Sequence, residues 1–110
     1  TVWQDADLRG ADFSHANLRE SYFTSANCEG ANFFAATLKG ASFMRARLVR
    51  TRFVGADLCA ADLTYTRLLD SQFTRSNCYD VKFLGAKIAS CDFLEANTTA
   101  AQFDHDYEGR

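Results

Sequence analysis

An apolar residue recurs at every fifth position of the chain from Trp3 to Phe103, with no insertion or deletion. This position, called i, occurs 21 times in succession and holds ten aromatic residues, seven leucines, one isoleucine, two cysteines and a threonine. Two residues earlier, at i−2, the side chain is small throughout, with thirteen alanines among the 21. A period of five matches neither the period of an α-helix nor that of a long strand, so the pattern predicts a chain that turns within every unit.

The polar positions indicate how each unit turns. Asp or Asn occupies i−1 in ten of the 21 units, and five of the six glycines occupy i+2. Glycine tolerates a positive φ, and a short polar side chain can hydrogen-bond to nearby backbone, so both suit a bend. We therefore expect short extended pieces with i and i−2 facing inward, i−1 and i+1 facing outward, and a bend at i+2.

The repeated motif is A(D/N)LXX, seen as ADLRG, ADFSH, ANLRE, ANCEG, ANFFA, ADLCA and ADLTY. It resembles the repeat of the pentapeptide-repeat proteins, and the resemblance covers essentially the whole chain. The resemblance implies an all-β fold, a right-handed quadrilateral parallel β-helix with four units per turn, which gives about 5.5 turns of 20 residues here. We expect one domain over residues 1–105 and a C-terminal tail outside the repeat frame over residues 106–110.

With 20 residues per turn, each inward residue lies on the one 20 positions away. Two opposite faces then carry mainly large aromatic side chains and the other two carry mainly leucine, so that each layer is filled without overpacking. The predicted structural core consists of two columns of large side chains, Phe13, Phe33, Phe53, Phe73 and Phe93 in one and Phe23, Phe43, Leu63, Phe83 and Phe103 in the other.

Composition excludes several classes of protein. Lys and Arg total 12 and Asp and Glu total 14, and the resulting net charge of −2 is too small to steer a polyelectrolyte by bulk charge. The chain has no apolar run near the roughly 20 residues that cross a bilayer. The arginine-rich stretch FMRARLVRTRF, residues 43–53, places every arginine at an outward or corner position. That placement favours a solvated belt over a nuclear-localisation or nucleic-acid site.

The sequence offers little for catalysis. His15 and His105 are too far apart to share a site, and there is no CxxC pair, phosphate-binding loop or nucleophile elbow. The carboxylates at i−1 are interpreted as turn-stabilising residues. We therefore expect no enzyme activity, no metal and no cofactor. Cys28, Cys78 and Cys91 take inward positions and Cys59 an outward one, which predicts free thiols and a reducing, cytoplasmic compartment.

One outward column departs from a random surface. Arg47, Arg67 and Lys87 stand 20 residues apart at i−1, which predicts a stacked basic ridge. On the same face, Val49 and Leu69 at i+1 predict an exposed apolar strip, a combination typical of an interface. We expect this surface to bind another protein. The full candidate set is Arg47, Arg67, Lys87, Val49, Leu69, Phe34, Arg50 and Arg52, where Phe34 points outward on the next face.

Two other functions remain open. Some pentapeptide-repeat proteins imitate DNA and modulate DNA gyrase or another type II topoisomerase, giving quinolone resistance. Charge argues against that function here. A DNA segment about 26 Å long, the length expected for about 5.5 turns at the strand spacing, carries about 15 negative charges, whereas the net charge of this chain is −2. The second alternative is a structural spacer that stacks end to end as a homodimer, because the open ends of a β-helix expose unpaired backbone. Direct nucleic-acid binding and a small-molecule substrate are disfavoured.

Overall fold

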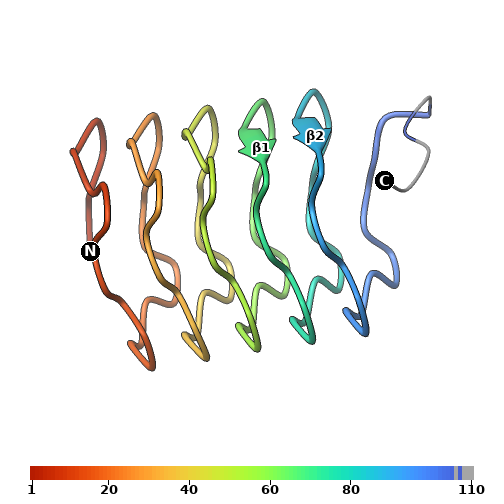
Figure 1. Cartoon of the computed structure of the whole chain (residues 1–110), viewed down its shortest axis with the longest axis horizontal. Coiled ribbons are helices and arrows are strands. Elements are labelled where there is room, and N and C mark those ends of the chain that lie inside the picture. The colour runs from red at the N-terminus through yellow and green to blue at the C-terminus, as the bar shows by residue number, and fades with distance from the viewer. Residues whose placement is uncertain (106, 108–110) are drawn as a thin grey trace.

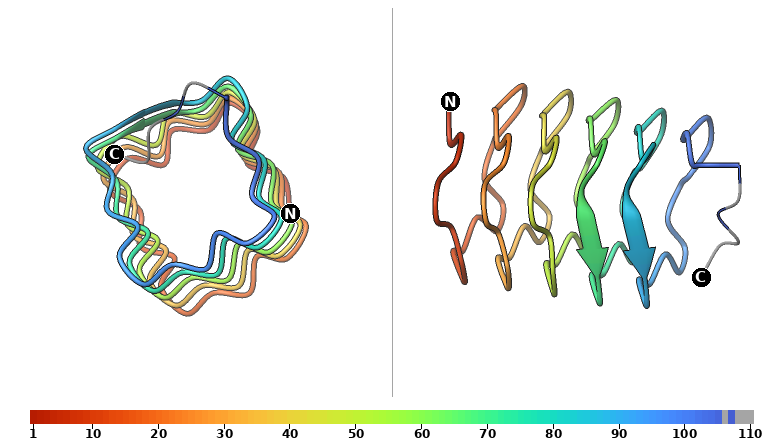
Figure 2. Two further views of the ribbon diagram at one scale, coloured as in Figure 1. Left: turned by 90° about the vertical axis from the view of Figure 1, so that its right-hand side faces the viewer. Right: turned by 90° about the horizontal axis from the view of Figure 1, so that it is seen from above.

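The computed structural model describes residues 1–105 and 107. The chain coils into a rod with Cα extents of 31 × 21 × 21 Å (Figure 1). Seen along the rod axis, successive coils follow one another on a four-sided outline (Figure 2). Within the described residues the only continuous strands are β1 (Arg67–Leu69) and β2 (Lys87–Ala89), which pair in parallel.

The register of the coils is constant along the rod. Sixteen isolated parallel bridges join an i−1 residue to the residue 20 positions later, from Val2 with Tyr22 to Lys82 with Gln102. β1 and β2 keep the same register, with Arg67 opposite Lys87. Each coil therefore holds four units of five residues, one for each side of the outline, as the family resemblance implies.

The bends follow one backbone rule. Every residue at i+2 from Asp5 to Ala100 has a positive φ, between 52° and 72°. In most units the next amide closes a β-turn, as where the Ala6 N–H donates to the Trp3 carbonyl at 3.1 Å. A positive φ at the third turn residue alone fits a type II turn. Fifteen of these residues are not glycine, so the repeated unit, rather than glycine, determines the bend.

The ten Asp and Asn residues at i−1 share one hydrogen bond. In each, the side-chain Oδ1 accepts from the backbone amide two residues later, at 2.8–3.4 Å. The other four amides of a regular unit donate to backbone carbonyls within the turn or in the neighbouring coil. The amide at i+1 is thus the one that needs a side-chain acceptor, which confirms the turn-stabilising interpretation of these residues.

This rule gives a prediction at Arg52, an i−1 residue that pairs with Asn32. Asn32 accepts from the Phe34 amide, but Arg52 has no oxygen to offer the Val54 amide. We expect Arg52→Asn to raise the free energy of unfolding by about 0.5–1.5 kcal/mol and Asn32→Ala to lower it by a similar amount. Denaturant unfolding measures both. Arg52→Gln is the control, because glutamine also removes the charge but holds its amide one methylene farther from the backbone than asparagine does. Equal stability of the Asn and Gln variants would contradict the rule.

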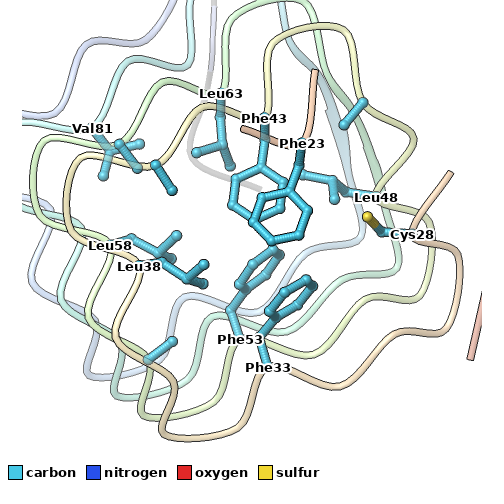
Figure 3. Close-up of a cluster of buried hydrophobic side chains, with 14 of the residues drawn as sticks. Phe23, Cys28, Phe33, Leu38, Phe43, Leu48, Phe53, Leu58, Leu63 and Val81 are labelled. Carbon is cyan, nitrogen blue, oxygen red and sulfur yellow. The ribbon is translucent and has the colours of Figure 1, made fainter. Parts of the chain in front are cut away.

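The core consists of stacked aromatic columns that meet edge to face (Figure 3). Phe33 and Phe53 stack with ring centroids 5.1 Å apart, and Phe23 and Phe43 stack at 4.6 Å. Between the columns, Phe33 meets Phe43 at 5.5 Å and 89°. All ten predicted core residues pack in this interior. Seven are fully or almost fully buried, and the three in the end coils, Phe13, Phe93 and Phe103, are partly buried.

The four cysteines are free. Cys28 and Cys78 lie in the core, where burial raises the thiol pKa to about 12 and about 11 respectively. Cys91 is partly buried, and burial raises its pKa as well. The inward cysteines therefore act as small apolar side chains rather than as reactive thiols.

The predicted C-terminal tail, residues 106–110, is described only at Tyr107, and its other four positions lie outside the described residues. The Tyr107 ring stacks on Phe103 with centroids 4.6 Å apart and 11° between planes. An aromatic ring thus continues the Phe83 and Phe103 column beyond the last inward position of the repeat frame.

Candidate protein-binding surface

An open hollow of about 270 Å³ lies at the C-terminal end and is lined by Phe93, Thr98, Phe103 and Tyr107, without an acid, a base or a cysteine. In the part of the chain that the structure describes, no three His, Cys, Asp or Glu side chains gather as a metal site would require. The same part contains no helix that could cross a membrane.

Three predicted residues form a continuous column on one side of the rod. Arg47 pairs with Arg67 across neighbouring coils, and Arg67 pairs with Lys87 between β1 and β2. All three are exposed, and neighbouring coils lie about 4.8 Å apart. We call these three residues the basic column and the side that carries them, residues 46–50, 66–70 and 86–90, the basic face.

The charge of the basic face is opposite to that of the rest of the chain. It carries four cations, Arg47, Arg50, Arg67 and Lys87, and one anion, Asp70, which gives +3. Because the whole chain has a formal charge of −2, the remaining residues carry −5. Although the net charge of the chain is near zero, the basic face is a locally positive surface. A negatively charged partner would be attracted to it.

At one end of the basic column, one acid of the rod offsets part of the positive charge. The Glu29 carboxylate, in the preceding coil, accepts from Arg47 Nε at 3.2 Å and also forms an ion pair with Arg50. Arg67 and Lys87 form no ion pair with any acid among residues 1–105 and 107. The Glu29 carboxylate is thus bound between Arg47 and Arg50. Arg67 and Lys87 have no such carboxylate among the described residues.

The basic column also breaks the hydrogen-bonding rule of the fold. On the same side in the first two coils, Asp7 and Asn27 accept from the amides two residues later, at 3.3 and 3.2 Å. Arg and Lys cannot accept such a bond, and like charges on directly opposed strand positions destabilise a sheet. These three positions therefore lack the side-chain acceptor that Asp and Asn supply in the repeat, and they place like charges on neighbouring coils.

The corner after the basic face differs from the regular turn. The Thr51 amide donates to Ser71 Oγ at 3.2 Å, and Thr51 Oγ1 donates to the Cys28 carbonyl at 2.9 Å. In the last of these coils, Cys91 Sγ donates to the Leu68 carbonyl at 2.9 Å. These side chains replace the turn hydrogen bond, and the backbone before Ser71 and Cys91 stays extended as β1 and β2. The sequence signal is a hydroxyl or thiol at i−2 in three successive coils, in place of alanine.

The predicted exposed apolar strip is wrong at Val49. Its side chain is only 5% exposed, and Leu69 is half-buried. Val49 lies between Arg47 and Arg50 in the sequence, and both of these arginines form ion pairs with Glu29. The apolar part of the basic face is consequently small.

Two other predicted residues lie on the neighbouring side of the rod. Phe34 is 38% exposed and packs edge to face against His15, with ring centroids 5.4 Å apart. Arg52 lies on that side as well, next to Asn32 in the preceding coil. The structure therefore groups Arg50 and Leu69 with the basic column but not Phe34 or Arg52.

Tyr65, which the repeat pattern did not predict, lies beside the basic face. This side chain is 61% exposed at the corner before Arg67, and the Arg45 guanidinium carbon lies 6.0 Å from its ring centroid. The ring covers Gly85 so closely that a Cβ there would lie 2.4 Å from Tyr65 Cδ1. The available signal was the spacing of 20 residues between the arginine, the tyrosine and the glycine.

Comparison with known proteins agrees with this architecture. The pentapeptide-repeat family model matches residues 4–40 and 41–77, with eight copies of the repeat. AT2G44920, a pentapeptide-repeat protein of the Arabidopsis thaliana thylakoid lumen, is 32% identical, with 98% of this chain and 71% of that one covered and a TM-score of 0.61. Alr5209, a pentapeptide-repeat protein of Nostoc PCC 7120, is 22% identical, with 94% and 80% covered and a TM-score of 0.70.

A weaker similarity links the chain to QnrB1, a plasmid-mediated fluoroquinolone resistance protein. The identity is 18%, the coverage is 84% of this chain and 60% of that one, and the TM-score is 0.41. Curated protein sequences give no match. The similarities to the first two structures confirm the predicted fold, a right-handed parallel β-helix.

Proposed function

The chain belongs to the pentapeptide-repeat family, and we propose that it is a non-catalytic binding module whose basic face receives an acidic segment of a partner protein. The observation that carries the proposal is the basic column. Its cations replace the residues that stabilise the turn, stack like charge on like charge, and include two that no acid of the described residues neutralises. A departure from the repeat with no structural gain is typical of a functional surface, and at Arg67 and Lys87 no ion pair among the described residues offsets it.

The expected partner is acidic because the basic face carries +3 and little exposed apolar area. Glu29 illustrates the contact, since its carboxylate lies between Arg47 and Arg50. A partner carboxylate would bind Arg67 and Lys87 in a similar way. Charge complementarity of this kind increases the association rate and specificity, and it makes binding sensitive to salt.

Affinity capture tests the proposal. The wild-type rod and an Arg47→Ser, Arg67→Ser, Lys87→Ser variant are immobilised and exposed to a lysate of the source organism. A control variant, Arg19→Ser, Lys39→Ser, Arg75→Ser, removes the same three charges from the other sides. We expect the wild type and the control to retain the same protein and the basic-column variant to lose it. Retention of that protein by the basic-column variant would refute the proposal.

DNA mimicry fits this surface less well. The i−1 positions, where acids would imitate phosphates, hold the basic column in the central coils. The proposal therefore predicts no effect on supercoiling by DNA gyrase, with or without a fluoroquinolone. An end-to-end spacer would leave the cations of the basic column unexplained.

We also propose a reducing, cytoplasmic compartment. The support is the set of four free cysteines, two of them buried in the core. An oxidising compartment would favour disulfides in a small domain. Two measurements test this part of the proposal: the compartment in which the protein is found after fractionation of the source cells, and the number of free thiols in the purified protein.

A further inference from the structure

We infer that the acidic segment recognised by the basic face is an α-helix that lies along the rod axis and presents Asp or Glu at every third or fourth position. This inference rests on the proposed function and concerns the form of the bound segment. It follows from the spacing of the basic column, compared with the spacing of acidic side chains on a helix and on a strand.

The helix matches the spacing of the cations. Arg47, Arg67 and Lys87 are separated by one coil each, so the column spans about 9.6 Å at the usual strand spacing. On an α-helix, three acids along one stripe occupy seven residues of rise, about 10.5 Å. The two lengths differ by about 1 Å, which long, flexible Arg and Lys side chains can absorb.

An extended segment does not match. Side chains on one side of a strand are about 6.8 Å apart, so three of them span about 13.6 Å. With its middle acid at Arg67, an extended peptide places each outer acid about 2 Å beyond its cation, whereas a helix places it only about 0.5 Å beyond. The column is therefore better suited to a helix than to a strand.

The residues beside the basic column also suit a helix. Leu69 lies two residues from Arg67 along β1, about 6.8 Å away, and Tyr65 lies at the corner before Arg67, where its φ is positive. A helix with its side chains is about 10–12 Å wide, so one centred on the column would extend about 5–6 Å to each side, toward the half-buried Leu69 and toward the corner that carries the exposed Tyr65. Tyr and Arg are the side chains that most often dominate binding energy at protein interfaces.

Two synthetic peptides of identical composition test the inference. Both have about 18 residues, long enough for a helix. One places its acids at every third or fourth position, and the other places them at alternate positions. Binding to the wild-type rod is followed by fluorescence anisotropy at low and moderate salt, and circular dichroism reports the helicity of the bound peptide. The Arg47→Ser, Arg67→Ser, Lys87→Ser variant and the control variant with serine at 19, 39 and 75 are measured in parallel.

The expected result is that the helix-spaced peptide binds about tenfold more tightly and that the basic-column variant alone loses this advantage. Equal or tighter binding of the strand-spaced peptide would overturn the helix while leaving the acidic partner of the proposed function intact. Failure of both peptides to bind would overturn the inference and the proposed function together. Tighter binding of a single-stranded oligonucleotide than of either peptide would overturn both in favour of a nucleic-acid partner.

Discussion

Replacing Phe53 with alanine is expected to lower the free energy of unfolding by about 3–5 kcal/mol. The Phe53 side chain is completely buried in the middle of the rod. Its ring stacks on Phe33 at 5.1 Å and on Phe73 at 4.9 Å. Removing it leaves a cavity between two rings that the backbone register holds apart, so the neighbours cannot close the gap.

The effect should be large because each coil of a solenoid contacts only its neighbours. A defect in the central coil separates the two halves of a domain whose total stability is expected to be about 5–15 kcal/mol. Denaturant unfolding measures the loss. Phe34→Ala is the matched control, because Phe34 adjoins the core position Phe33 but is 38% exposed. Equal losses in the two variants would contradict the account of the core.

Replacing Ala56 with leucine is expected to lower the free energy of unfolding by about 1–3 kcal/mol, although the change adds apolar surface. Ala56 is an i−2 residue with 1% exposure, and its counterparts in the adjacent coils are Ala36 and Ser76, which are also buried. A leucine there would have to displace the inward side chains of its own layer. The constant 20-residue register gives the backbone little freedom to move aside.

The control for this substitution is Val54→Leu. Val54 is half-exposed at an outward position of the preceding unit, where one more methylene meets solvent. Thermal unfolding of both variants and the wild type measures the difference. An Ala56→Leu variant as stable as the wild type would show that the interior has spare volume, contrary to a filled core.

The fold could be predicted because the same residue pattern recurs in every unit. The inward residue, the small residue at i−2 and the short polar residue at i−1 each have one physical role, and 21 units repeat them in phase. The paired columns of Phe13 and Phe23 followed from the alternation of aromatic residues and leucine. The hydrogen bond from the i+1 amide explains why Asp and Asn occupy i−1.

The outer surface could be predicted only in part. The basic column followed from the spacing of 20 residues, because coils stack side chains of equal phase. The burial of Val49 did not follow, and neither did the ion pairs of Arg47 and Arg50 with Glu29 in another coil. Tyr65 was missed because the repeat places no constraint on the type of residue at a corner. The contacts of each outward side chain depend on its own neighbours, so the five-residue period of the sequence does not determine these contacts.

The central claim is that the basic face is the binding surface of this rod. Chemical-shift mapping of the ¹⁵N-labelled protein, titrated with the helix-spaced acidic peptide, tests it most directly. The account predicts that the largest shifts fall on the amides of residues 46–50, 66–70 and 86–90 and on Tyr65. Shifts concentrated instead on the opposite side, around Asn17, Asp57 and Asn77, would contradict it.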